Sequence, residues 1–265
     1  MSRESMPISS SWFQGAIITY LIGFTVLALL AYLVYRDQPP LPGRVVAGEK
    51  VLFTRDDIIG GMNVFQRYGL MEYGPVYGHG AYLGPDFTAE YLHKSAESLV
   101  SIYSTAALPG RSARERVVAE LHENAYDPDK DSLTWTVSRG KAHSTMEEYY
   151  RSVFNAKKTR GGAPAEWIAN PDDIRKLTAF FAWTAWTAAA DRPGHSYSYT
   201  NNWPSEPLAG NFITPDAISW SVISIIALLG GTGLVLYCFG RYDWLGWSEP
   251  EIKPVHGMPQ GRRYL

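Results

Sequence analysis

The 265-residue sequence contains one cysteine, Cys238, and this scarcity excludes several kinds of site. A single thiol forms no intrachain disulfide and cannot build a four-thiolate metal centre. It also excludes the CxxCH motif that attaches a c-type haem, because that motif needs two cysteines. Since Cys238 lies inside an apolar run, we expect it to face lipid or to pack against a helix.

An excess of one charge sign is also missing. The sequence has 24 Lys and Arg residues against 26 Asp and Glu residues, whereas nucleic-acid-binding proteins carry a clustered basic excess. We therefore expect no nucleic-acid partner. The six histidines form neither HxxxH nor HExxH, and the sequence has no GxSxG elbow and no phosphate-cradling glycine loop. No catalytic residue is predicted in this chain.

Two uncharged runs, 12–35 and 217–240, are each long enough to cross the hydrocarbon core as a helix, which takes about 20 residues. The alternatives are a cleaved signal peptide for the first run and buried core helices for both. The first run is longer than the apolar part of a signal peptide and ends at Arg36 and Asp37, which favours a retained anchor. We therefore predict two transmembrane helices.

Two spans would place both termini on the same side of the membrane. Arg3 and the basic residues of the C-terminal tail put that side in the cytoplasm by the positive-inside rule. The predicted organisation is a cytoplasmic N-terminus (1–11), a first span (12–35), a periplasmic or extracellular domain (36–216), a second span (217–240) and a cytoplasmic tail (241–265).

The 36–216 segment is long enough for a domain with its own core, and its apolar spacing is mainly helical. Residues 45–70 predict a short hairpin and then a helix, with Asp56 as its cap. The inner face of that helix is expected to hold Ile58, Ile59, Met62 and Phe65. Further helices are expected over 86–103, 110–126, 143–158 and 171–194, the last with a cap near Asp172. A second hairpin is expected between the helices over 110–126 and 143–158.

Two turn-rich loops are the most distinctive stretches. Residues 71–93 contain glycines at 74, 78, 80 and 84, which permit positive φ angles, so we expect a tight loop pressed against something flat. Residues 195–211 combine tyrosines, asparagines, a tryptophan and prolines just before the second span, and we expect this loop at the membrane interface. His79 and His93 are interpreted as hydrogen-bonded structural residues rather than metal ligands.

The stretches MEYGPVYGHGAYLGPDFTAEYLH and FFAWTAWTAAADRPGHSYSYTNNWPSEPL closely resemble the N-terminal part of quinol-dependent nitric oxide reductase, in the haem–copper oxidase superfamily. The order of span, domain and span matches too, and the resemblance extends to about Gly240. It implies a membrane protein of the bacterial inner membrane, with two transmembrane helices flanking a mainly α periplasmic domain. That domain would have a cytochrome c-like fold without haem c.

The resemblance implies that the chain is a subunit of a split enzyme or an N-terminal segment of a fused one. The enzyme would reduce two nitric oxide molecules to nitrous oxide with electrons from a quinol. Haem b, haem b3 and non-haem iron would lie in the catalytic membrane subunit, on which this chain docks without being catalytic itself. A nitric oxide dismutase, or a membrane-anchored assembly or scaffold protein, are the alternatives.

Gly78, Gly80, Tyr82 and Pro85 match the GxGxYxxP loop of the related two-chain reductases, whose tyrosine region helps to bind a calcium ion bridging haem propionates. Gly80 and Tyr82 are therefore the expected calcium or haem-propionate contacts. Tyr82→Ala is expected to lower assembly or activity while leaving the chain folded. The expected interface residues are Tyr77, His79, Pro85, Asn202, Trp203 and Glu206.

Overall fold

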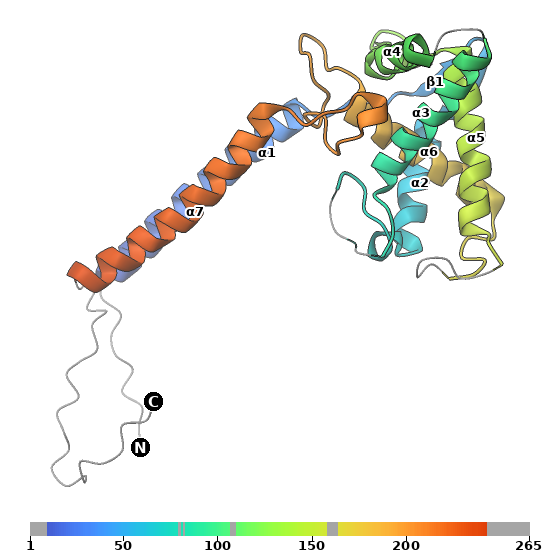
Figure 1. Cartoon of the computed structure of the whole chain (residues 1–265). Helices are drawn as coiled ribbons and strands as arrows, with labels where there is room; N and C mark the ends of the chain where they lie inside the picture. Colours follow the sequence, from blue (N-terminus) through green and yellow to red (C-terminus); the bar gives the residue numbers. More distant parts are fainter. Residues whose placement is uncertain (1–9, 79–80, 82, 107–109, 158–163, 243–265) are drawn as a thin grey trace, which may run out of the picture. The chain divides into compact units, whose positions relative to one another are not determined.

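The computed structural model describes residues 10–78, 81, 83–106, 110–157 and 164–242 (Figure 1). The described chain divides into two units. One contains helix α1 (Ser10–Arg36) and helix α7 (Pro215–Tyr242) from Ser219 onward, and the other is the Asp37–Ile218 domain. The helices of the domain are α2 (Arg55–Arg67), η1 (Leu70–Glu72), α3 (Phe87–Thr105), α4 (Gly110–His122), α5 (Val137–Phe154), α6 (Pro171–Ala189) and η2 (Pro207–Ala209).

Helices α1 and α7 extend the two predicted apolar runs by one or two residues at each end. By length and composition, Phe13–Arg36 and Pro215–Tyr242 are both able to cross a membrane, and no residue of the apolar window of either is buried. Exposed apolar surface of this extent is unfavourable in water and suggests membrane anchoring. The topology and the choice of membrane remain predictions from sequence.

The domain opens with the predicted hairpin of β1 (Arg44–Ala47) and β2 (Lys50–Thr54), followed directly by α2. The prediction that Asp56 caps α2 is wrong. Thr54 is the cap, because its side chain accepts a hydrogen bond from Asp57 N, while the Asp57 carboxylate accepts one from Thr54 N at 2.9 Å. This reciprocal pair is a capping box, and it lets the strand pass into the helix without a loop.

The inner face of α2 differs from the prediction. Ile58 and Phe65 are buried as expected, but Ile59 and Met62 are 38% and 39% exposed. The reason is Gly61, which lies on nearly the opposite side of the helix from Ile59. A methyl group on Gly61 would overlap a backbone carbonyl of α6, so α2 turns its glycine side toward α6 and its Ile59 side outward.

Helices α3 and α4 lie where the sequence predicts them. Asp86 caps α3 by accepting a hydrogen bond from Ala89 N at 2.8 Å, as one of the two expected starts. The apolar residues expected along α3 are all buried: Phe87, Tyr91, Leu92, Leu99 and Tyr103. Helix α4 ends at His122, four residues earlier than expected, because the chain there enters a strand.

Helices α5 and α6 are capped by residues that the periodicity did not identify. Helix α5 begins at Val137 rather than at 143, because the Thr136 side chain accepts a hydrogen bond from Arg139 N at 3.0 Å. Helix α6 is capped by Asn170, two residues before Asp172 and so near the predicted place; the backbone N of Asp172 donates to the Asn170 side chain at 3.0 Å.

The second hairpin, β3 (Tyr126–Asp127) and β4 (Ser132–Trp135), is confirmed. The two hairpins join into one sheet of order β2-β1-β4-β3, in which β1 runs parallel to β4. This joining was not predicted, because it pairs segments that lie far apart in the sequence.

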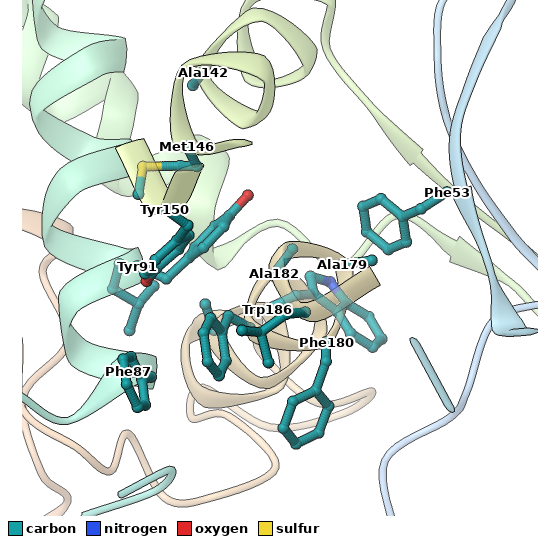
Figure 2. Close-up of a cluster of buried hydrophobic side chains, with 14 of the residues drawn as sticks. Phe53, Phe87, Tyr91, Ala142, Met146, Tyr150, Ala179, Phe180, Ala182 and Trp186 are labelled. Carbon is teal, nitrogen blue, oxygen red and sulfur yellow. The ribbon is translucent and has the colours of Figure 1, made fainter. Parts of the chain in front are cut away.

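The core is built around α6, which contacts α2, α3, α4 and α5. Phe181 of α6 stacks on Phe87 of α3 with ring centroids 4.5 Å apart, and both side chains are fully buried. Figure 2 shows Phe87, Tyr91, Tyr150, Phe180 and Trp186 gathered in this cluster. The many aromatic residues of α6 therefore serve mainly as core. Trp183 is half-buried, and its indole N–H donates to the Pro40 carbonyl at 3.0 Å.

A candidate docking site formed by two loops

The first loop, residues 71–86 and called the glycine loop below, packs its glycines against its own domain. A methyl group on Gly84 would lie 2.6 Å from the Tyr73 ring, and one on Gly74 would overlap the Pro85 carbonyl. The two limbs of the loop therefore approach as closely as backbone allows. The sequence predicted a tight loop against a flat surface, and for these two glycines that surface is internal.

Gly78 marks the contact between the glycine loop and the second loop, residues 195–214, called the asparagine loop below. Its φ is +73°, and a methyl group there would overlap the Trp203 indole. The same indole donates its N–H to the Tyr77 carbonyl at 2.5 Å. Glycine fits here because the site needs both a left-handed backbone and space for a ring.

Tyr77 anchors the glycine loop through three of its groups. Its backbone N donates to Thr88 Oγ1 at 3.1 Å, its carbonyl accepts from Trp203, and its hydroxyl lies 2.6 Å from Thr187 Oγ1. Burial raises the pKa of the Tyr77 phenol well above its usual range, so the group stays neutral. Its φ of +56° is uncommon for a non-glycine residue and is sustained by these three contacts.

Asp86 fastens the base of the glycine loop to α3. One of its carboxylate oxygens accepts from Gly78 N while the other caps the helix at Ala89 N. Next to it, the Thr88 hydroxyl donates to Thr184 Oγ1 of α6 at 3.2 Å. Two helices of the core therefore hold the loop, although its own contacts are mostly polar.

The asparagine loop is shaped by its asparagines. Asn201 and Asn202 have φ angles of +54° and +60°, a region that asparagine tolerates better than most residues. The Asn202 amide accepts from Ser198 N at 2.8 Å and donates to the Phe212 carbonyl at 3.0 Å, which closes the loop. This closure presents Trp203 toward the glycine loop.

Glu206 ties the asparagine loop to α3. Its carboxylate accepts from Leu208 N at 3.0 Å and lies 3.1 Å from His93 Nδ1. On the other side of the ring, His93 Nε2 lies 3.3 Å from Glu97. His93 is thus a hydrogen-bonded residue between two carboxylates, in agreement with the structural interpretation from sequence.

The structure brings most of the predicted interface residues onto two joined loops. Trp203, which is 39% exposed, and Pro85 reach the surface, whereas Asn202 is buried and Tyr77 and Glu206 are half-buried. Gly80, Tyr82 and His79 lie outside the described residues, so the calcium or propionate contact stays a prediction. Within the described ranges, no group of three or more His, Cys, Asp or Glu residues is arranged to hold a metal ion.

A family comparison assigns the domain that carries these loops. The model of the NorB cytochrome c-like domain, a part of nitric oxide reductase, matches residues 42–205, which is more than half of the chain. The chain belongs to this family. A search of curated proteins gave no match. The family assignment supports the relation to nitric oxide reductase that the two loop sequences predicted.

The residues of this nitric oxide reductase domain do not fit a covalently attached haem. The one cysteine of the whole sequence, Cys238, lies in α7 and outside the matched range, so no thioether pair can form there. The buried imidazole of His143 is already engaged, with Nδ1 2.8 Å from the Tyr91 hydroxyl. Aromatic rings fill the centre of the domain, with Phe154 stacked on Tyr150 beside the Phe87 cluster.

A buried polar cluster lies between α3, α4 and α5. Burial lowers the pKa of Arg139 to about 10, and the guanidinium stacks 4.4 Å from the Trp135 ring centroid. Glu120 accepts hydrogen bonds from Tyr103 and Thr136 in the same region. Arg139 also donates to the Glu120 carbonyl at 3.2 Å, so these polar groups link α3, α4 and α5 to one another.

A groove of about 600 Å³ runs along α3 and α5 and was not anticipated from sequence. Its polar groups are largely engaged, since Lys94 pairs with Glu97 at 2.9 Å and the Thr145 hydroxyl donates to the Lys141 carbonyl. The two joined loops, with their exposed tryptophan, are therefore the better candidate for a functional surface.

Proposed function

We propose that this chain is a non-haem-bearing subunit or N-terminal segment of a quinol-dependent nitric oxide reductase. Its domain is periplasmic and docks on a haem b catalytic membrane subunit, which holds haem b, haem b3 and non-haem iron and reduces two nitric oxide molecules to nitrous oxide. The glycine and asparagine loops form the docking surface. The chain itself carries no electrons.

The observation that carries this proposal is the family match over residues 42–205, flanked by two apolar helices. A domain between two membrane anchors is held at the surface of the bilayer, where a membrane-embedded catalytic subunit presents its periplasmic side. The absence of a CxxCH motif from the whole sequence supports a structural rather than an electron-carrying role.

The geometry of the loops supports docking through them. The Tyr77 backbone accepts a hydrogen bond from Trp203 and donates one to Thr88, so the exposed surface around it is organised before a partner binds. Preorganised surfaces lose less conformational entropy on binding than flexible ones. Leu83, 65% exposed, and Trp203 supply the apolar groups that such an interface needs.

Purification of the affinity-tagged full chain from its native membranes in mild detergent tests the proposal. We expect a partner with haem b absorption in a fixed ratio to the chain, and nitrous oxide production from nitric oxide with a quinol donor. Trp203→Ala is expected to lower the haem b content of the purified complex. Val137→Ala is the matched control, because Val137 is an exposed apolar residue on α5, outside both loops.

Each other outcome contradicts part of the proposal. A colourless chain isolated without haem would support a membrane-anchored assembly or scaffold protein. Dinitrogen and oxygen as products would identify a nitric oxide dismutase, while leaving the docking role intact. Equal haem content in the Trp203 and Val137 variants would show that the two loops are not the docking surface.

A further inference from the structure

We propose that the asparagine loop rests in the headgroup region of a lipid bilayer through Phe212. The proposal depends on α7 spanning the membrane, as the proposed function requires, and it adds a lipid contact to the domain itself. The Phe212 side chain is large and 60% exposed, in a loop otherwise rich in asparagine and serine, whereas the exposed part of Trp203 belongs to the docking surface proposed above.

The first observation is the short connection to α7. Phe212 precedes Pro215, the first residue of α7, by three residues, a length of chain that spans at most about 10 Å. The connection is also fixed, because Thr214 N donates to the Asn201 carbonyl at 3.2 Å and Asn202 donates to the Phe212 carbonyl. Phe212 therefore cannot lie far from the point where the apolar helix begins.

The second observation concerns the exit from α1. The Arg192 guanidinium donates to the carbonyl of Asp37, the first residue after that helix, at 2.9 Å. Its neighbour Asp191 pairs with Ser198 in a β-bridge, and Ser198 N donates to the Asn202 side chain. One continuous segment therefore contacts the chain both where it leaves α1 and where it enters α7.

These contacts determine what covers the Phe212 ring. If α1 and α7 cross a membrane, their junctions with the domain lie at its surface, and a segment bonded to both junctions lies there as well. Interfacial segments bury phenylalanine side chains at the boundary between headgroups and acyl chains, so the exposed Phe212 ring is stabilised there. The chain connections to α1 and α7 therefore place Phe212 against lipid.

Spin labelling of the full chain in nanodiscs of phosphatidylcholine and phosphatidylglycerol tests the proposal. Cys238→Ser removes the one native thiol, and single cysteines are then introduced as Phe212→Cys, Leu228→Cys and Val137→Cys. Leu228 lies within α7 and is 69% exposed, and Val137 is 58% exposed at the start of α5, so all three positions accept a label without disturbing the core. Collisions with oxygen, which prefers lipid, and with a water-soluble nickel chelate are measured by electron paramagnetic resonance.

We expect the label at 212 to have an oxygen-to-nickel accessibility ratio severalfold above that at 137 and below that at 228. A ratio at 212 equal to that at 137, with 228 in lipid, would overturn the headgroup contact alone. Protection of 212 from both reagents would also overturn it, and would indicate a protein cover. A water-like ratio at 228 would contradict the membrane span, and with it the proposed function.

Discussion

The α2–α6 helix pair and the pair of joined loops both connect segments more than 100 residues apart, but they use opposite means. The two helices pack closely because Gly61 has no side chain, which lets α2 approach the backbone of α6. The loops meet through added groups, the Trp203 indole and the hydrogen bonds that surround Tyr77. Packing holds the first contact and directional hydrogen bonds the second, so they should fail in different ways.

The largest expected effect is at the helix pair. Gly61→Ala would place a methyl group against the Lys176 carbonyl and 2.7 Å from Phe180 Cβ, neither of which can move without shifting α6. We expect the free energy of unfolding to fall by about 1–3 kcal/mol, as for other overpacked cores. Denaturant unfolding of the full chain in detergent, followed by tryptophan fluorescence, measures the change.

Gly60→Ala is the matched control. A methyl group there meets the flexible side chain of Lys176, with its closest atom, Cδ, at 3.0 Å, rather than backbone. Because alanine is favoured over glycine in a helix by up to about 1 kcal/mol, we expect this variant to be neutral or more stable. Equal losses in the two variants would mean that the helices do not meet at Gly61.

The second effect concerns the capping box. Burial alone would raise the pKa of Asp57, but hydrogen bonds from Arg175 and Thr54 outweigh it and lower the pKa below its usual range. We expect Asp57→Ala to lower the free energy of unfolding by about 1–2 kcal/mol at neutral pH. Asp56→Ala should cost less, because Asp56 is exposed and does not cap the helix.

The sign of the pH dependence follows from the lowered pKa of Asp57. Its stabilising contribution is complete above the unfolded value, ordinarily about 3.9, and is lost as the pH falls through the lower folded value. The difference between wild type and Asp57→Ala should therefore persist at pH 5 and shrink below about pH 4. A difference that stays constant down to strongly acidic pH would contradict the assigned contact.

A smaller and more local effect is expected at the loops. Trp203→Phe keeps a ring against Gly78 but removes the N–H that donates to the Tyr77 carbonyl. Losing this one hydrogen bond weakens the contact between the two loops by about 0.5–1.5 kcal/mol. We expect little change in global unfolding but faster hydrogen exchange at amides of both loops. Hydrogen exchange measured by mass spectrometry distinguishes local opening of the loops from global unfolding. Unaltered exchange in the glycine loop would contradict the assignment of Trp203 as its anchor.

The smallest effect should come from His93. Its side chain is 42% exposed, and exposed pairs of this kind contribute about 0–1 kcal/mol. We expect His93→Phe to change the free energy of unfolding by less than about 1 kcal/mol, with faster exchange confined to the η2 region. A loss as large as that of Gly61→Ala would point to a role beyond the bonds to Glu97 and Glu206.

The sequence allowed the elements of the core to be predicted because apolar spacing records burial directly. The helix positions, both hairpins and the buried residues of α3 followed from it. Which side of α2 faces α6 could not be predicted, because a close contact at a glycine does not change the spacing of the apolar residues. The cap of α5 was missed because Thr136 follows a strand without a break, so the two patterns merge.

The loops were recognised by composition, yet their partners were not. Four glycines predicted a close approach, but no local pattern indicates that Trp203, 125 residues after Gly78, is what one of them meets. Asp86 was expected as a possible cap, whereas its second bond to Gly78 N depends on the folded loop. Contacts between distant turns need three-dimensional structure, because each half is satisfied by many sequences.

The parallel pairing of β1 with β4 has a consequence for the order of folding. Each hairpin is followed immediately by a threonine cap and a helix, so two ββα units can form from local contacts. Joining them through Arg44 and Ser132 requires closure of a long loop, whose entropic cost is recovered only when the sheet and the α6 core are in place. We expect the β1–β4 amides to gain protection last when the chain refolds.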